Sequence, residues 1–407
     1  MWMLFFIVLT AVVGINFTRR QRGKLWYVIL AEVALLIRFA LVFAIYYNGT
    51  ETLGTDGLIY HLVAKNVANQ LWDGVPIFNV EYKFTWYTVL VGLQYAIFGV
   101  NRYAASFTNA FLAILSGFYL TDIAVNLKFT YKKSAFIGLA YIFMPSMMVW
   151  TTDTRKESLT FFAAILIWHI NLLLLKEREW PTSRRIAYVA AICLLLWLST
   201  LLRIYMLFTL GGGLLVCLFF HYLKTRRRFI LYFGVTILIF SCVIAYTTVY
   251  ANLHDYHALP MDSSQQGDDT LDNEVNTILD IILSKDIPQS INGFFTEPHL
   301  DKVQNISDIA GYYSLITLVR IEMLLWYACM IMALFGILEC LLKFDSYLLG
   351  LLAFIVSYSL INALVSENVA DTYYRYRAAI VAPVLLFADY RPLFNHMKSI
   401  IMRKSIV

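Results

Sequence analysis

Asp56 is an acidic residue that stands directly ahead of an apolar-periodic run, in the segment Leu53–His61. A carboxylate at the boundary between water and lipid can act as a general base toward a hydroxyl group. Asp56 could instead be the N-cap of the helix that follows, because aspartate is a preferred capping residue. His61 could extend a polar site on the same helix or simply face water.

A second acidic residue, Asp153, is followed closely by the cations Arg155 and Lys156. The two cations should keep its carboxylate ionised. Asp153 is therefore a second candidate for acid–base chemistry, and the alternative is that it caps a helix or forms a structural ion pair.

Three further arginines lie at the ends of apolar segments: Arg203 in a very short turn, and Arg375 and Arg377 in the segment Tyr373–Arg377. Arginine binds phosphate oxygens in a bidentate manner. Cations gathered at the level of lipid headgroups indicate an anionic ligand, and a lipid phosphate is the natural one. The alternative is that each cation reaches water or pairs with a local acid. The acids available are Asp153, Glu157, Glu367 and Asp371.

Motifs for other chemistries are absent from the sequence. It contains no HExxH, paired CxxC, P-loop or GxSxG motif, so zinc, nucleotide and serine-hydrolase chemistry have no support. Its five cysteines lie singly in or beside apolar segments and predict neither a disulfide framework nor a metal site. The run Gly211–Gly213 lies within an apolar segment and is more typical of close helix packing than of phosphate binding.

The elements that position these residues must be membrane helices. Of the 407 residues, 60% are hydrophobic and only 14% are charged, whereas soluble domains are about 45–50% apolar and about 25% charged. This excess excludes a soluble enzyme, a nucleic-acid-binding protein and a disordered protein. We expect an all-α polytopic membrane protein.

Apolar stretches of about 20 residues predict about 11 transmembrane helices. They fall near residues 1–17, 24–47, 103–125, 134–151, 158–175, 186–201, 204–222, 229–250, 317–342, 347–365 and 378–391. A basic cluster follows the first stretch and none precedes it, so we expect a retained helix rather than a signal peptide.

Most lysines and arginines lie in alternate loops, which the positive-inside rule assigns to the cytoplasm. This predicts an extracytoplasmic N-terminus and a cytoplasmic C-terminus. It also requires the short apolar segment 85–100 to lie at the outer interface as a juxtamembrane helix.

Four regions follow from this topology. Residues 1–23 form an extra N-terminal helix with a basic cytoplasmic turn, and 24–250 form a transmembrane module whose first outer loop is 48–102. Residues 251–316 form an acidic extracytoplasmic loop, and 317–407 hold the last helices and a basic tail.

Arg38 lies inside the expected span 24–47. A charge at such a depth costs at least about 2.5–3.5 kcal/mol and normally faces a polar cavity or partner. Glu32 is six positions away, on another face of the helix. Arg38 must therefore find a different partner, which makes it a candidate for a functional role.

The order of these features resembles the GT-C superfamily of integral-membrane glycosyltransferases, above all the protein mannosyltransferases and the bacterial aminoarabinose transferases. The resemblance covers about 31–176 and 373–390. It begins with the span that carries Arg38 and continues through Asp56 and Tyr60 to the segment Ala105–Phe111. It then runs through Pro145–Trp150 to Asp153–Glu157, and ends with the Tyr-Arg-Tyr-Arg segment at 374–377.

The resemblance implies an inverting transferase of the plasma membrane, active at the extracytoplasmic face in cell-envelope glycan or glycoconjugate synthesis. It would take a sugar from a polyprenyl-phosphate donor to a glycan, lipid or protein acceptor. Asp56 matches the catalytic base of the family and Asp153 its second-loop acid. The donor phosphate would meet Arg375, Arg377, Arg155, Lys156 and Arg203, supported by Arg38, Tyr60, His61 and Tyr374. Asp56 is not part of a DxD or ExD motif, so a divalent metal stays open without support from the sequence, and no cofactor is certain.

Two other classes stay open. An outer-leaflet polysaccharide polymerase or ligase would also have many spans and outer arginines, but its large loop is rich in basic residues, whereas 251–316 is acidic. A transporter of lipid-linked sugars would need polar residues along a path through the bilayer. Most charges in this chain lie at the ends of the expected spans.

Overall fold

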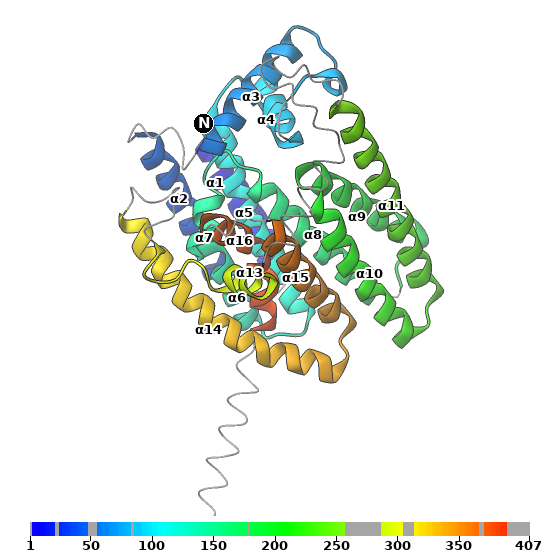
Figure 1. The fold of residues 1–407 in the computed structure, drawn as a ribbon. Helices are drawn as coiled ribbons and strands as arrows, with labels where there is room; N and C mark the ends of the chain where they lie inside the picture. The colour runs from blue at the N-terminus through cyan, green and yellow to red at the C-terminus, as the bar shows by residue number, and fades with distance from the viewer. Residues whose placement is uncertain are drawn as a thin grey trace, which may run out of the picture.

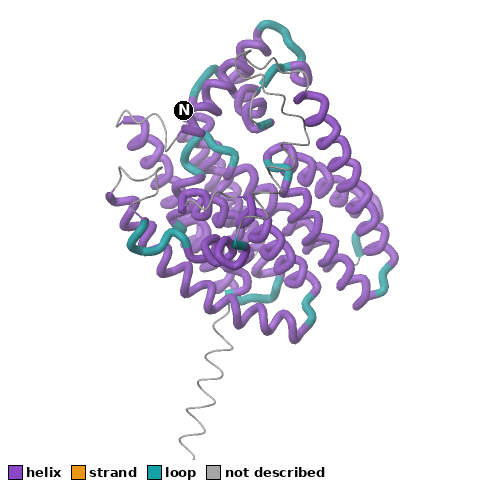
Figure 2. Tube along the Cα trace, in the orientation of Figure 1, coloured by secondary structure: helices purple, strands orange, loops and turns teal. Residues whose placement is uncertain are grey.

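The computed structural model describes residues 2–20, 24–47, 55–82, 85–177, 179–256, 286–303, 313–365 and 370–388. These residues form helices joined by loops and turns, without a strand among them (Figure 2). The α-helices are α1 (Trp2–Arg20), α2 (Leu25–Tyr47), α3 (Thr55–Trp72), α4 (Trp86–Phe98), α5 (Arg102–Asn126), α6 (Tyr131–Phe143), α7 (Pro145–Trp150), α8 (Glu157–Lys176), α9 (Thr182–Leu202), α10 (Tyr205–Thr225), α11 (Arg228–Tyr256), α13 (Ile287–Thr296), α14 (Tyr313–Lys343), α15 (Ser346–Val365) and α16 (Ala370–Phe387).

Within the described residues, nine helices are long and apolar enough to cross a membrane. They are α1, α2, α5, α8, α9, α10, α11, α14 and α15. This number of apolar helices indicates a multi-pass integral membrane protein, as the composition predicted.

The expected count of about 11 spans is not confirmed. The stretch 134–151 is divided into α6 and α7, because Pro145 cannot continue a helix and forces the residue before it into extended backbone. Met144 accordingly has φ −63° and ψ 127°. The last expected span, 378–391, starts earlier than predicted, since α16 begins at Ala370. The arginines expected ahead of that helix are therefore inside it.

The segment 85–100 forms α4, a helix of 13 residues, which is too short to span a bilayer. It packs against α3, where Trp72 Nε1 donates to Ala96 O at 3.0 Å. The two helices stand together at one end of the molecule, beyond the main bundle (Figure 1). A short non-spanning helix was the expectation for this segment.

Small residues allow the long helices to approach closely. A Cβ atom at Gly350 of α15 would lie 2.7 Å from Gly213 O of α10, so this crossing requires glycine. Gly213 thus has the packing role predicted for the glycine run, whereas a Cβ at Gly212 would meet open space. The most enclosed of the nine apolar helices is α8, whose window is 78% buried.

The acidic region 251–316 is described only in part. Helix α11 reaches into it as far as Tyr256, and α13 lies against α15 and α16 (Figure 1). Residues 257–285, 304–312 and the basic tail beyond 388 lie outside the described residues.

Candidate active site

The first-loop acid and an arginine of α16 meet directly. Arg375 Nη1 donates to Asp56 Oδ2 at 2.5 Å, joining the first turn of α3 to the first turns of α16. The side chain of Asp56 is 37% exposed and that of Arg375 is 17% exposed, so the ion pair is partly accessible. Asp56 is the second residue of α3 and lies inside its first turn rather than at the N-cap position before it. Its side chain is an ion-pair partner.

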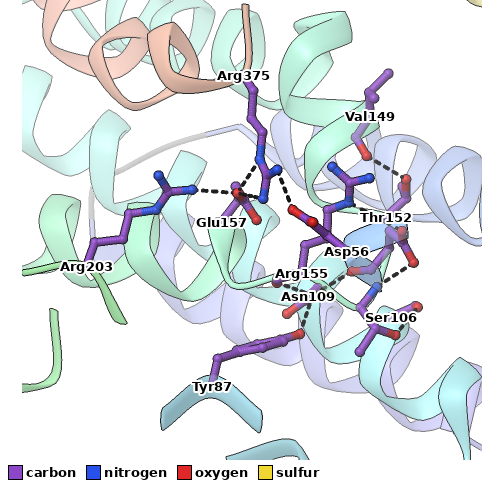
Figure 3. A network of polar contacts seen from close by, with 12 residues as sticks. Asp56, Tyr87, Ser106, Asn109, Val149, Thr152, Arg155, Glu157, Arg203 and Arg375 are labelled. Atoms are coloured by element: carbon purple, nitrogen blue, oxygen red, sulfur yellow. Dashed lines mark hydrogen bonds and ion pairs between the residues drawn. The ribbon is translucent and has the colours of Figure 1, made fainter. Parts of the chain in front are cut away.

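Glu157, the first residue of α8, lies at the centre of the cluster (Figure 3). Its Oε1 accepts from Arg375 Nε and from Arg203 Nη2, each at 2.6 Å. Arg375 Nη2 forms an ion pair with the same oxygen, also at 2.6 Å. Glu157 is fully buried, and a buried carboxylate is tolerable when it is paired. Arg203 comes from the turn between α9 and α10 and also donates to Tyr205 Oη at 2.5 Å.

Lys156 precedes Glu157 and faces the same charges. Burial, with repulsion from Arg203, lowers the pKa of Lys156 to about 8, although Glu157 favours its charged form. Tyr60 of α3 also faces this group. Burial raises the pKa of Tyr60 to about 12, and the carboxylates of Glu157 and Asp56 add to the rise. We call Asp56, Lys156, Glu157, Arg203 and Arg375 the acid–arginine cluster.

Asp153 forms a separate pair with Arg155, 3.4 Å from Nε to Oδ2, and accepts from Thr154 N at 2.7 Å. Burial raises the pKa of Asp153, against the opposing charge of Arg155. The amide of Asn109 holds this loop from α5, lying 2.7 Å from Asp153 O and 2.8 Å from Arg155 O. Asn109 was part of the resemblance but was not assigned a role by the sequence.

Two contacts connect the pair to the acid–arginine cluster. A Cβ at Gly57 would lie no more than 2.7 Å from the three carboxylate atoms of Asp153, so the residue after Asp56 touches the second acid. The guanidinium carbons of Arg155 and Arg375 also lie 5.1 and 6.0 Å from the Trp150 ring, a range in which cations are attracted to aromatic faces.

Arg377 is not brought together with this cluster, contrary to its expected place beside Arg375. Two positions along a helix point to different faces. Arg377 Nη1 donates to Glu297 O at 2.6 Å, at the C-terminus of α13, and its guanidinium lies 5.0 Å from the Trp326 ring. These contacts attach α13 to α14 and α16.

Arg38 has structural partners in the helix junction. It donates to Ile142 O at 2.6 Å and to Thr151 Oγ1 at 3.3 Å, so it bridges the end of α6 and the end of α7. His61 does not simply face water, because its Nδ1 lies 2.9 Å from Tyr95 Oη.

Glu322 of α14 was missed by the sequence reasoning. It is buried and accepts from Tyr374 Oη and from Ser146 N, each at 2.6 Å. We call these hydrogen bonds of Glu322 the brace. Tyr374, which was expected to support the site, is held by the brace and directly precedes Arg375 in α16. The available signal was an acid isolated inside an apolar span, which normally has a partner.

Some polar atoms of the cluster lack partners among the described residues. Glu157 Oε2 and Arg203 Nε are both buried without a hydrogen bond there. Buried polar groups are rarely left in this state, so a ligand or water molecule can complete both. The part of the chain that the structure describes contains no group of three His, Cys, Asp or Glu residues that could hold a metal ion.

No protein-family model matches the chain, and no curated protein matches it in sequence. Solved structures are similar in fold. The oligosaccharyltransferase AglB of Archaeoglobus fulgidus, in complex with an inhibitory peptide and a dolichol-phosphate, has a TM-score of 0.52 and 13% identity, over 94% of this chain and 52% of AglB. The A. fulgidus enzyme tethered to an acceptor peptide gives 0.50 and 13%, over 90% and 49%. ArnT from Cupriavidus metallidurans gives 0.49 and 14%, over 94% and 63%.

The archaeal structures show that the chain is similar in fold to the GT-C glycosyltransferases, as the resemblance predicted. The chain spans about half the length of these two structures. At such low identities the likeness extends to the fold alone.

Proposed function

We propose that the protein is a GT-C-type glycosyltransferase that moves a sugar from a polyprenyl-phosphate donor to a glycan, lipid or protein acceptor. The observation that carries this proposal is the 2.5 Å ion pair between Asp56 and Arg375. It unites the residues expected to serve as base and as phosphate ligand. The dolichol-phosphate bound to AglB, a protein of similar fold, supports this donor class.

Inverting transfer needs two groups on opposite faces of the sugar: a base for the acceptor and a cation for the leaving phosphate. In the resting arrangement the carboxylate of Asp56 is paired with the guanidinium of Arg375. When a donor binds, its phosphate takes the place of the Asp56 carboxylate on Arg375, and the sugar enters between them. Asp56 is then free to act on the acceptor.

In the transfer step the acceptor hydroxyl gives its proton to Asp56, and its oxygen forms the new bond to the anomeric carbon. The bond between that carbon and the phosphate oxygen breaks, and its electron pair remains on the phosphate. Arg375, Arg203 and Lys156 stabilise the added charge. Two carboxylates face these three cations, so the cluster retains one positive charge for the phosphate.

Glu157 holds Arg375 and Arg203 in place, and the pair of Asp153 and Arg155 supports the loop that leads into Lys156 and Glu157. Arg377 and Tyr374 act on the position of α16 rather than on the phosphate. We further propose that the site faces the extracytoplasmic side of the plasma membrane, in cell-envelope glycan or glycoconjugate synthesis, with the N-terminus outside. The four regions expected from the sequence keep their boundaries in this proposal.

The test is transfer of labelled sugar from polyprenyl-phosphate donors by the purified full-length protein in lipid nanodiscs. Asp56→Asn should abolish transfer, because the amide cannot accept the proton. The matched control is Asp73→Asn, which changes an exposed acid at the end of the same helix. Full activity in folded Asp56→Asn protein would remove Asp56 from the chemistry.

A further inference from the structure

A basic hollow of about 470 Å³ lies at the end of the molecule opposite the acid–arginine cluster. Three lysines line it, and each comes from the end of a different helix: Lys128 after α5, Lys176 at the end of α8 and Lys224 near the end of α10. Helix α8 connects the two sites, since it begins at Glu157 and ends at Lys176. Its 20 residues place the hollow about 30 Å from the acid–arginine cluster.

The charge of this hollow is unbalanced. None of the three lysines makes an ion pair with another described residue. Asp345 is the acid in the lining, and its Oδ1 accepts from Tyr347 N and Leu348 N at 3.0 and 3.2 Å. Asp345 keeps its negative charge while it accepts these hydrogen bonds, but the three lysines exceed it by two positive charges. The hollow therefore favours an anion.

The positive-inside rule explains why single lysines lie at this end. It does not require lysines from three separate turns to converge on one hollow. The floor beside them is apolar, with Leu127, Leu172 and Leu175 in the lining. Basic pockets between membrane helices with such neighbours suit a phosphate headgroup attached to a hydrocarbon chain.

We propose that this hollow binds a phosphate group, supplied either by the headgroup of an anionic phospholipid or by free phosphate. Lys128, Lys176 and Lys224 hold the charge, and the hydroxyls of Thr225 and Ser346 lie in the same lining. The site is separate from the acid–arginine cluster and does not depend on the function proposed for that cluster.

The test uses native mass spectrometry of the full-length protein in detergent, with phosphatidylglycerol, phosphatidylcholine or inorganic phosphate added in separate samples. The test variant carries Lys128→Gln, Lys176→Gln and Lys224→Gln. The control carries Arg19→Gln, Lys132→Gln and Arg228→Gln, which remove the same charge from exposed positions at the same end. The unfolding temperature is measured for both, to establish that they fold.

We expect wild type and control to retain phosphatidylglycerol in preference to phosphatidylcholine. The test variant should bind it more weakly, by roughly fivefold for each lysine removed. If phosphatidylglycerol stays bound in millimolar inorganic phosphate, the phospholipid headgroup is the source of the bound phosphate group. If inorganic phosphate displaces phosphatidylglycerol, free phosphate is the source. Equal retention by test variant and wild type, or an equal loss in the control, would overturn the site.

Discussion

Asp56 and Arg375 are 319 positions apart in the sequence, and their side chains form an ion pair of 2.5 Å. The same guanidinium donates to Glu157 through Nε and forms an ion pair with it through Nη2. One planar group therefore joins α3, α8 and α16. Arginine alone has enough donors in a fixed geometry to do this.

Arg375→Lys should reduce sugar transfer by about a hundredfold, the cost of losing one oriented donor at a developing oxyanion. Lysine keeps the charge but cannot reach both acids at once. The values of kcat and KM for the donor are the measurements. Arg320→Lys, at an exposed position of α14, is the control and should stay within roughly twofold of wild type. Equal activity of the two variants would show that the planar group is not required.

Glu157→Gln should destabilise the protein by about 3–5 kcal/mol, because it leaves two buried or half-buried arginines with a neutral partner. The free energy of unfolding can be measured by denaturant titration in micelles. Glu177→Gln, at an exposed residue just after the same helix, should change it by less than about 0.5 kcal/mol. A small effect of Glu157→Gln would mean that the arginines find other partners.

The sequence could predict the composition of the site better than its contacts. Asp56, Asp153 and the flanking cations are visible because they stand beside long apolar segments. Their pairing is not visible, since it depends on how α3 and α16 meet across more than 300 intervening residues. Arg375 and Arg377 look equivalent in sequence, yet the turn of the helix sends only Arg375 to the cluster.

Helices were predictable from the sequence where an apolar stretch is long enough to span a membrane. The helix boundary at Pro145 was not, because the hydropathy pattern continues through this proline although the helix does not. Glu322 was missed for a similar reason, since one acid hardly changes the hydropathy of α14. Its partners Ser146 and Tyr374 come from segments far away in the sequence.

Gly57→Ala should lower both stability and transfer. The new methyl group would overlap the Asp153 carboxylate, so α3 has to move and Asp56 moves with it. Overpacking of this kind costs about 1–3 kcal/mol. Gly212→Ala is the control, because a Cβ at that helical position meets open space and should leave unfolding and transfer almost unchanged. Wild-type behaviour of both variants would mean that α3 does not pack tightly on the Asp153 loop.

The affinity for the donor should fall as the pH rises through about 8, because burial and repulsion from Arg203 lower the pKa of Lys156 to about 8. The ammonium is charged below that pH and helps to bind phosphate. The pH profile of kcat/KM reports this group in the free enzyme. In Lys156→Gln the step near pH 8 should disappear while a lower, flat profile remains. A step that persists in the variant would assign it to another group.

The lowered pKa of Lys156 also makes the free energy of unfolding depend on pH. An unfolded lysine has a pKa of about 10.4, above that of Lys156 in the fold. Between about pH 8 and 10.4 the unfolded chain therefore binds more protons, and Lys156 makes the free energy of unfolding rise with pH. Lys156→Gln should remove that rise, which thermal unfolding at several pH values can measure.

Glu322→Gln should weaken the brace between α14, α7 and α16. The carboxylate accepts from Ser146 through two atoms and from Tyr374, and an amide has one oxygen left to accept them. The loss should cost about 1–3 kcal/mol of stability. Because Tyr374 adjoins Arg375, transfer should fall roughly tenfold with the displacement of that arginine.

The matched control for this brace is Glu339→Gln, on the same helix, where the acid makes a surface pair with Lys343. Such pairs contribute little, so stability should change by less than about 1 kcal/mol and transfer should be unchanged. Tyr374→Phe separates the two roles of the brace, since it keeps the ring against Trp150, 5.8 Å between centroids, and removes only the hydrogen bond. A loss of transfer in Tyr374→Phe without a change in donor KM would assign the brace to the orientation of Arg375 during the reaction. If Glu322→Gln and Tyr374→Phe both transferred sugar at the wild-type rate, α16 would hold Arg375 in place without them.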